Sequence, residues 1–391
     1  MLKNKENKYK IIFLGTSSFP HGMAEVEKQT LIARALQEQG CKVTFVCKKS
    51  FNYSSDIPFK GAYKNIQYIY TSFSAKRLRN KILNQVLWII GNILEKIYIL
   101  SANFDFAIVN SRNYDEIKWY AKLVHLRKRK IFLTHVEDYR SMHPNPSRKM
   151  TKEIDDFENK TWFIIDGAFP ISEELTKQIM SKNKHLPLLK IPVLVDLNEV
   201  NNAINVEPVT GPYFMFCGSS DYEATIRQII KGFEMTNVDT KLLLVLNGSL
   251  KSMAQVKYLI NSSTVEKQII LKTDLPKNQL WGYYKDATAL LIPLNFNQRD
   301  KARFPHKIGE YCAVGRPIIT CDWGEIPVYF RNNENAIILR NNDAKELRNA
   351  LEVIENNPEL REKLGQGTLK LARDHFDYKL YGAGILNFIN Q

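Results

Sequence analysis

The sequence has few cysteines and lacks the short motifs that mark the common nucleotide and metal sites. Five cysteines stand in 391 residues, at positions 41, 47, 217, 312 and 321, and their spacing fits no metal site. Most lie within apolar runs, which predicts buried free thiols in a reducing compartment. There is no Asp-x-Asp pair, no GxxxxGK[ST] loop, no GxGxxG after the first apolar strand and no nucleophile elbow. These absences disfavour a metal-dependent reaction, a P-loop, a dinucleotide fingerprint and a serine hydrolase.

Long apolar runs are also missing. No stretch approaches 18 uninterrupted apolar residues, so no membrane-spanning helix is expected. The composition, 44% hydrophobic and 25% charged, is typical of a folded globular protein. At 391 residues the chain exceeds the size at which one core stops growing, which predicts two domains.

Positive charge is concentrated in the first half of the chain. Residues 1–200 hold 32 Lys and Arg against 20 Asp and Glu, a net charge of +12, whereas residues 201–391 hold 23 against 21, a net of +2. A basic half predicts an anionic partner, which could be nucleic acid, a membrane surface or a substrate. The sequence contains no nucleic-acid-binding module and no basic–aromatic interleaving, so no nucleic-acid partner is expected.

One segment of the basic half, "AKRLRNKILNQVLWIIGNILEKIYIL" (75–100), joins a basic cluster to a long apolar helical pattern. Two interpretations stay open. The segment is a core helix with a basic start, which is slightly favoured, or it lies on an anionic membrane surface. Five polar residues interrupt the pattern and argue against spanning: Asn84, Gln85, Asn92, Glu95 and Lys96.

Short apolar strands alternate with amphipathic helical segments along the chain. This order predicts an α/β protein with two doubly wound, Rossmann-like domains facing each other across a cleft. The expected strands are 10–15, 42–47, 105–110, 130–134, 167–172, 213–217, 241–247, 268–272, 289–294, 317–320 and 336–339.

The alternation pauses at residues 201–212, a polar stretch that ends in Pro-Val-Thr-Gly-Pro and is typical of a linker. We therefore expect an N-terminal domain over 1–200 and a C-terminal domain over 213–376. The C-terminal helix, 377–391, is expected to rejoin the first domain.

Four loops at predicted strand ends carry polar or glycine residues suited to a ligand. Gly22 precedes a helix whose free N–H groups would bind an anion, and His135 directly follows a strand. Gly218 permits close backbone approach, with Arg227 on the helix that follows. In 295–310, "NFNQRDKARFPHKIGE" brings cations to a helix N-terminus, which predicts an anion site. A purely structural turn at Gly22 and a purely structural His135 remain as alternatives.

The order of these segments resembles the GT-B glycosyltransferases, specifically the retaining family 4 within the glycosyl transferases group 1. "FPHGMAEVEKQTLIARALQEQGCKVTFVC" is similar to the family's opening loop, helix and second strand. "DGAFPISEELTKQI" with "LLKIPVLVDLNEV" resembles the segments that lead to its interdomain linker. "FPHKIGEYCAVGRPIIT" (304–320) resembles the most specific family signature, K-x-x-E-Y-x-A-x-G-x-P-V-I.

This resemblance implies that the first domain binds the acceptor and that the second binds the nucleotide sugar. It also implies roles for particular residues. Glu310 would accept hydrogen bonds from the donor ribose, with Arg303 and Lys307 beside the diphosphate. Lys272, Thr273, Asp274 and Leu275 would lie near the nucleobase. Gly22 would lie near the diphosphate and acceptor, and His135 near the donor sugar, which makes His135, Arg303 and Lys307 the predicted catalytic residues.

Two positions depart from the family pattern. Many members carry a second glutamate earlier in the signature, where Ala302 stands in this chain. A basic residue usually follows the first glycine of the second domain, where this chain has Ala224, and Arg227 is the nearest cation.

The resemblance implies transfer of a sugar from a UDP- or GDP-type donor to a hydroxyl of a glycan or lipid-linked acceptor. The reaction would retain anomeric configuration, need no metal or other cofactor, and serve cell-surface polysaccharide synthesis. We expect a cytoplasmic location, with the basic domain as a candidate for peripheral attachment to the inner face of the plasma membrane. The alternatives are a non-catalytic GT-B-like protein that binds a nucleotide sugar or a partner, and a sugar-nucleotide epimerase.

Overall fold

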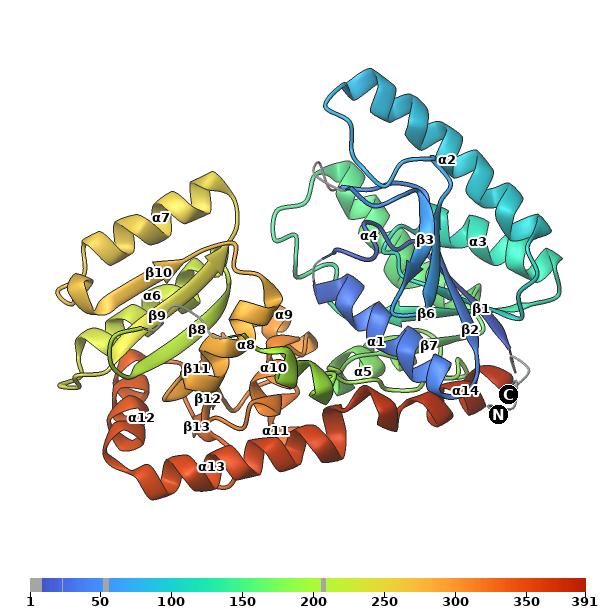
Figure 1. Cartoon of the computed structure of the whole chain (residues 1–391). Coiled ribbons are helices and arrows are strands. Elements are labelled where there is room, and N and C mark those ends of the chain that lie inside the picture. The colour runs from blue at the N-terminus through green and yellow to red at the C-terminus, as the bar shows by residue number, and fades with distance from the viewer. Residues whose placement is uncertain (1–8, 23, 52–55, 205–208) are drawn as a thin grey trace. The chain divides into compact units, whose positions relative to one another are not determined.

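The computed structural model of the chain describes residues 9–22, 24–51, 56–204 and 209–391. The chain divides into two compact units (Figure 1). The first comprises Met1–Leu194 together with Tyr378–Gln391, and the second comprises Val195–Asp377. The expected boundary lay a few residues later, at 200, and four residues of the expected linker, 205–208, fall outside the described part of the chain.

The first unit is built on a seven-stranded sheet with the order β3-β4-β2-β1-β5-β6-β7. All neighbouring strands are parallel except the β3–β4 pair. The strands are β1 (Lys10–Leu14), β2 (Lys42–Cys47), β3 (Lys60–Tyr63), β4 (Ile66–Tyr70), β5 (Phe106–Val109), β6 (Lys130–His135) and β7 (Gly167–Pro170). The order reverses between β1 and β5, and in doubly wound sheets ligands bind at the carboxyl ends of the strands near such a reversal.

Helices cover both faces of this sheet, which explains why its strands are apolar on both sides. They are α1 (Ala24–Glu38), α2 (Lys81–Ser101), α3 (Tyr114–Leu126), α4 (Arg148–Lys160), α5 (Glu173–Lys182) and α14 (Gly382–Asn390), with short 3-10 turns at Thr161–Phe163 and Tyr378–Leu380.

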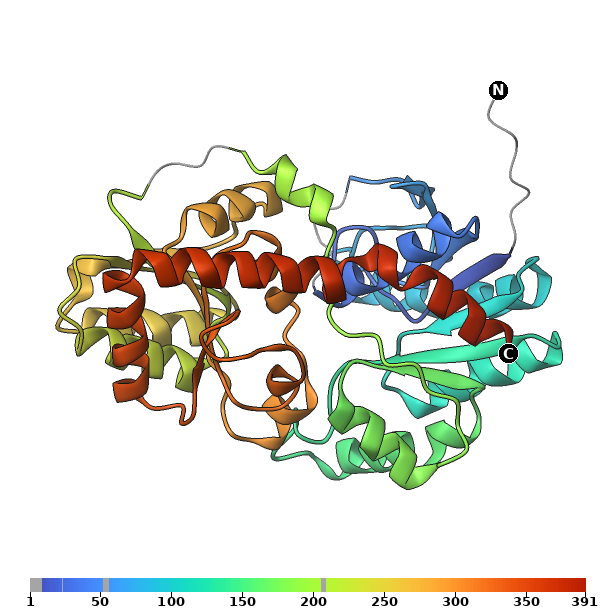
Figure 2. The same ribbon diagram turned by 90° about the horizontal axis from the view of Figure 1, so that it is seen from below.

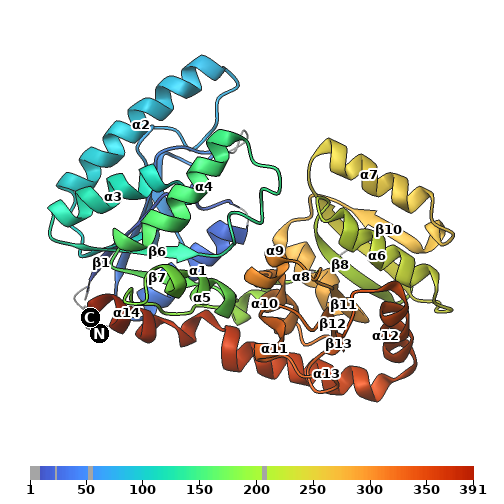
Figure 3. The ribbon, with the colours of Figure 1, turned by 180° about the vertical axis from the view of Figure 1, so that it is seen from behind.

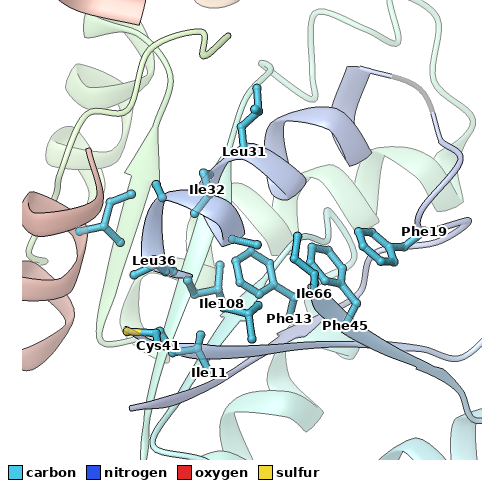
Figure 4. Packing of buried hydrophobic residues seen from close by; sticks show 14 of the residues in the cluster. Ile11, Phe13, Phe19, Leu31, Ile32, Leu36, Cys41, Phe45, Ile66 and Ile108 are labelled. Carbon is cyan, nitrogen blue, oxygen red and sulfur yellow. The ribbon is translucent and has the colours of Figure 1, made fainter. Parts of the chain in front are cut away.

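The core beneath α1 combines aliphatic side chains with stacked aromatic rings (Figure 4). The rings of Phe13 and Phe19 both stack on Phe45, at centroid distances of 4.7 and 4.1 Å. Ile32 and Leu36 reach the same core from α1 and are fully buried. This packing fixes the loop that leads from β1 to α1 and contains Gly22.

Helix α14, which ends the chain at the point marked C in Figure 2, packs on α1 within the first unit. A side chain at Gly382 would meet the Ala35 carbonyl oxygen at 2.2 Å, so the two helices can approach closely only with glycine there. The Tyr378 hydroxyl accepts a hydrogen bond from Arg34 at 2.9 Å and donates one to Glu38 at 3.3 Å.

The second unit contains a fully parallel six-stranded sheet with the order β10-β9-β8-β11-β12-β13. The strands are β8 (Tyr213–Ser219), β9 (Lys241–Asn247), β10 (Ile269–Lys272), β11 (Ala289–Ile292), β12 (Ile318–Cys321) and β13 (Ile337–Leu339). The order reverses between β8 and β11, so the carboxyl ends of these two strands mark the expected ligand edge.

The helices of the second unit follow each strand in turn. They are α6 (Glu223–Glu234), α7 (Leu250–Asn261), α8 (Lys277–Asp286), α9 (Gln298–Ala302), α10 (Lys307–Ala313), α11 (Ile326–Tyr329), α12 (Ala344–Asn356) and α13 (Pro358–Leu371). Shorter helical turns lie at Leu197–Asn202, Glu266–Gln268 and Ala372–Phe376.

The predicted α/β class with two parallel-sheet, Rossmann-like domains is confirmed, and each expected strand is present. All five cysteines are buried and free, as predicted. The hairpin of β3 and β4 was missed. Its turn residues, Lys64 and Asn65, both have positive φ, at 48° and 63°. Only Asn65 among them is a typical residue for such a turn, so the sequence signal was weak.

The favoured interpretation of segment 75–100 as a core helix is wrong. Helix α2 has only three buried residues, Gly91, Glu95 and Ile99. It is long and apolar enough to cross a membrane, judged by length and composition alone. Asn80 caps its N-terminus by accepting hydrogen bonds from the backbone N–H groups of Ile82 and Leu83.

Candidate active site

A buried carboxylate lies in the second unit, on the short helix α10. Glu310 is 5% exposed, and its Oε2 lies 2.7 Å from the Lys307 ammonium and 3.2 Å from the Tyr284 hydroxyl, which donates to it. Gly315, with φ of +66°, follows the last turn of α10, because a left-handed residue ends a helix readily. Lys307 and Glu310 are therefore a largely buried ion pair and not an exposed one.

The electrostatics keep Glu310 ionised. Burial acts to raise the pKa of Glu310, but the charge of Lys307, with smaller contributions from two further basic residues, outweighs it, so the pKa lies below its usual value. Burial acts to lower the pKa of Lys307, but Glu310 and, to a smaller extent, Cys217 together raise it above its usual value. An ionised carboxylate can accept two hydrogen bonds at once, as recognition of a pair of hydroxyls requires.

Helix α8 links Glu310 to the loop predicted to hold the nucleobase. The Lys272 ammonium lies 5.3 Å from the ring centroid of Tyr283, and the next residue, Tyr284, contacts Glu310. Asp274 has a positive φ of 53°, and its N–H donates to the Asn247 side chain at 2.8 Å. Thr273 and Asp274 are exposed and Leu275 is half-buried. The loop and Glu310 thus lie in one region of the second unit.

A cationic cluster surrounds Tyr222, at the start of α6. The guanidinium carbons of Arg303 and Arg299 lie 4.4 and 4.9 Å from its ring centroid. Both arginines donate to the Tyr222 hydroxyl, and Arg303 also donates to buried Asp300 at 2.6 Å. The cluster lies beside the loop that follows β8, and Gly218, which was predicted to lie in that loop, is the penultimate residue of the strand itself.

A pocket of about 580 Å³ opens at the reversal of the strand order in the second sheet. It is lined by residues that follow β8 and β11, together with one residue that follows β13: Asp221, Glu223, Ala224, Arg227, Gln228, Asn295, Phe296 and Asn342. Its volume suits a small-molecule ligand. Arg227 reaches the pocket, but it is exposed and paired with Glu223.

The two remaining predicted residues belong to the first unit. His135 ends β6 and is 5% exposed, with its ring 5.2 Å from Trp162 and 5.6 Å from Phe157. Burial, with a smaller contribution from Arg112, lowers the pKa of His135 to about 3, so the imidazole is neutral near pH 7. A Cβ at Gly22 would meet Val26 at 2.2 Å, which shows a tight turn into α1.

The structure separates the predicted residues into groups. Glu310 and Lys307 lie with the loop of Lys272 to Leu275, Arg303 lies at Tyr222, Arg227 lines the pocket, and Gly22 and His135 lie in the other unit. Sequence reasoning missed Tyr222, Tyr284 and Asp300. Only Asp300 left a signal, since it precedes Arg303 by three residues on a helical turn.

The sequence of the second unit is similar to a known protein family. The model of the family described as glycosyl transferases group 1 matches residues 198–370. The match lies within the second unit and covers most of it. It includes both Glu310 and the pocket at the β8–β11 reversal. No curated protein matches the chain in sequence.

Solved structures match the whole chain in fold. Sucrose-phosphate synthase from Thermosynechococcus elongatus is 14% identical, with a TM-score of 0.76 over 98% of this chain and 99% of that one. HepE from Anabaena, in complex with UDP and glucose, is 14% identical, with a TM-score of 0.71 over 98% and 99%. The lipopolysaccharide outer core galactosyltransferase WaaB is 17% identical, with a TM-score of 0.62 over 97% and 98%. The resemblance to GT-B glycosyltransferases is confirmed for the fold.

Proposed function

We propose that this protein is a glycosyltransferase that moves a sugar from a nucleotide diphosphate donor to a hydroxyl of a glycan or lipid-linked acceptor. The observation that carries the proposal is Glu310, an ionised carboxylate that is buried beside a lysine on the signature helix. A buried charge is costly to maintain, so a ligand that uses it is a strong reason for its presence. In this role Glu310 accepts hydrogen bonds from the donor ribose.

Positive side chains supply the stabilisation that the departing diphosphate needs. Arg303 and Arg299 are held at Tyr222 and Lys307 at Glu310, so their charges are in place before the donor binds. Charges that need no rearrangement stabilise a leaving group efficiently. With no Asp-x-Asp pair in the sequence, these cations carry the proposed metal-independent mechanism.

The finer features extend the proposal. HepE, a structure of similar fold, holds UDP and glucose, which supports a UDP-type donor, with GDP as the other candidate. The fold shared with WaaB supports a glycan or lipid-linked acceptor in cell-surface polysaccharide synthesis. Retention at the anomeric carbon, hexosyl transfer and a cytoplasmic location at the inner face of the plasma membrane follow from the family 4 resemblance.

A second candidate is a non-catalytic protein that binds a nucleotide sugar. The observation that favours it is Ala302, a fully buried residue at the place where many family members carry the glutamate for the transferred sugar. Such a protein would hold the donor through Glu310 without transferring its sugar.

Binding of nucleotides to the full chain tests the proposal. Thermal unfolding is measured with UDP, GDP, ADP, CMP and their common sugars, for the parent, Glu310→Gln and Glu352→Gln. Glu352 is a matched control, since it pairs with Arg348 on the exposed face of α12. A nucleotide at a hundredfold excess over Kd should stabilise the parent and the control by about 2.7 kcal/mol. The same nucleotide should leave Glu310→Gln unchanged.

The outcomes separate the candidates. If no nucleotide stabilises the parent, or if Glu310→Gln responds as strongly as the control, the donor role of Glu310 is wrong. If a nucleotide sugar binds through Glu310 but is neither hydrolysed nor transferred to any glycan or lipid-linked acceptor tried, the non-catalytic candidate replaces the enzyme.

A further inference from the structure

Helix α2 carries a row of exposed apolar side chains that we call the apolar stripe: Ile82, Val86, Ile89, Ile93, Ile97 and Leu100. Their exposure runs from 40% at Leu100 to 78% at Ile82. At 100° per residue, these six positions fall within about 80° of one another around the helix. Figure 3 shows α2 at the outer side of the first unit, next to α3. A stripe this long and regular is a rarity on a surface in contact with water.

The opposite side of α2 is fixed to the ends of two strands. A Cβ at Gly91 would meet the Lys48 carbonyl oxygen at 2.4 Å, and the Thr71 hydroxyl donates to the Gly91 carbonyl at 2.7 Å. Lys48 follows β2 and Thr71 follows β4, so α2 is attached at the carboxyl edge of the sheet. Ligands bind at this edge in doubly wound domains.

Two polar residues of α2, Glu95 and Asn84, lie off the stripe and hold the helix to neighbouring segments. Glu95 is 1% exposed and accepts a hydrogen bond from the Tyr120 hydroxyl at 2.8 Å. The Asn84 amide exchanges two hydrogen bonds with the backbone of Leu78. These two hydrogen bonds between Asn84 and Leu78 hold the preceding basic segment against the first turns of α2.

Basic residues lie at one end of the stripe and beside it. Lys76, Arg77, Arg79 and Lys81 are exposed at the start of the helix. Along its flank, cations are paired with exposed aromatic rings. The Lys49 ammonium lies 4.9 Å from the Phe51 ring and 5.1 Å from the Trp88 ring. Trp119, on α3, has the ammonium groups of Lys96 and Lys122 at 4.8 and 5.4 Å.

We propose that α2 and the basic segment at 76–81 dock the protein on an anionic lipid bilayer, with the helix axis parallel to the surface. The stripe enters the boundary between headgroups and acyl chains, the tryptophans lie at the headgroup level, and the lysines and arginines contact lipid phosphates. The helix does not span the bilayer, because Gly91, Glu95 and Ile99 remain packed in the fold. Charge complementarity selects lipid over a second copy of this chain, since two such basic surfaces would repel each other.

Vesicle flotation of the full chain tests this docking surface. The probes are vesicles of phosphatidylcholine alone and of phosphatidylcholine with phosphatidylglycerol. The parent should float with the anionic vesicles, bind neutral ones about tenfold or more weakly, and lose affinity as salt rises. The triple variant Ile82→Gln, Ile89→Gln, Ile93→Gln should bind the anionic vesicles about a hundredfold less well.

Matched control variants test whether the loss of vesicle binding is specific to the apolar stripe. Glutamine is a better helix former than isoleucine, so the triple variant should keep its thermal unfolding temperature. The control carries Leu126→Gln, Met180→Gln and Leu250→Gln, three exposed apolar residues on other helices, and should float like the parent. Lys76→Glu with Arg79→Glu should reduce binding to anionic vesicles only.

Three results would overturn the proposal. The parent could stay unbound with anionic vesicles at low salt, the triple variant could float as well as the control, or the lipid-free parent could be a dimer that the triple variant converts to monomer without changing flotation. The last result would assign the stripe to a second copy of the chain. Flotation needs no nucleotide, so docking and donor binding can fail independently.

Discussion

Two buried carboxylates, one in each unit, have similar neighbours and opposite pKa shifts. Glu95 and Glu310 are 1% and 5% exposed, and each accepts a hydrogen bond from a buried tyrosine, at 2.8 and 3.2 Å. Each also has a lysine nearby. Yet burial raises the pKa of Glu95 to about 7, whereas the pKa of Glu310 is lowered.

The position of the lysine accounts for the difference. The Lys307 ammonium lies 2.7 Å from Glu310 Oε2. The Lys48 ammonium lies 4.0 Å from Glu95 Oε2 and is closer to the carboxylate of Glu116. Desolvation therefore dominates at Glu95, and the opposite charge dominates at Glu310. A carboxyl that is readily protonated suits the attachment of α2, and one that stays ionised suits recognition of a ligand.

Removal of the two lysines should give the largest difference in stability between the two sites. Lys307→Met leaves Glu310 buried without its main partner and should lower the free energy of unfolding by about 3 to 5 kcal/mol. Lys48→Met should cost only about 1 to 2 kcal/mol, because Glu95 takes up a proton and keeps its bond to Tyr120. Urea unfolding of both variants at pH 7 measures the two costs. Equal costs would show that the lysine position does not decide the pKa values.

The pH dependence should have opposite signs at the two sites. Between pH 4.5 and about 7 the folded protein holds a proton on Glu95 that the unfolded chain has released. The stability due to Glu95 is therefore complete below pH 4.5 and is lost as the pH rises through about 7. The stability due to Glu310 is present above pH 4.5 and is lost as the pH falls through its lowered pKa.

Glutamine variants show how the contribution of each glutamate to the free energy of unfolding changes with pH. Relative to the parent, Glu95→Gln should gain about 3 kcal/mol as the pH rises from about 4.5 to about 8. The deficit of Glu310→Gln should shrink as the pH falls below 4.5. Hydrogen exchange of each unit over a pH series measures both effects separately. Slopes of the same sign at the two sites would contradict the assigned pKa shifts.

The smallest effect is expected at an exposed pair. Arg227 and Glu223 form an ion pair one helical turn apart, and both side chains are more than a third exposed. Solvent screens such pairs, so Arg227→Gln should change the free energy of unfolding by less than about 0.5 kcal/mol. Urea unfolding of Arg227→Gln and Lys307→Met under the same conditions compares the two losses in the free energy of unfolding. A cost near that of Lys307→Met would mean that burial is not what makes the Glu310 pair important.

The alternation of apolar strands and amphipathic helices was sufficient to predict the architecture. Residues 241–247 form β9 with the predicted bounds, because a short unbroken apolar run is typical of a strand buried on both faces of a parallel sheet. Residues 66–70 alternate, with Ile66, Tyr68 and Tyr70 buried, but their partner β3 has only exposed and half-buried residues and little hydrophobic signal. The hairpin was missed for that reason.

The candidate site was predictable only where a motif marks it. Glu310 and Lys307 lie in the one strong signature of the chain, and Arg303 directly precedes it. Tyr222 and Tyr284 come from other elements and have no motif of their own. A single sequence does not reveal which tyrosine reaches a carboxylate or a guanidinium across a fold.

By itself, the sequence determined the two-domain α/β class, the strand order along the chain, the basic first half and the signature helix, since local periodicity and composition carry this information. The tertiary structure decided which charges lie beside which. It buried Glu310 against Lys307, set Glu95 farther from Lys48, and turned the apolar face of α2 outward. The physical reason is that pKa values and exposure depend on neighbours within a few ångströms, and packing of distant segments supplies those neighbours.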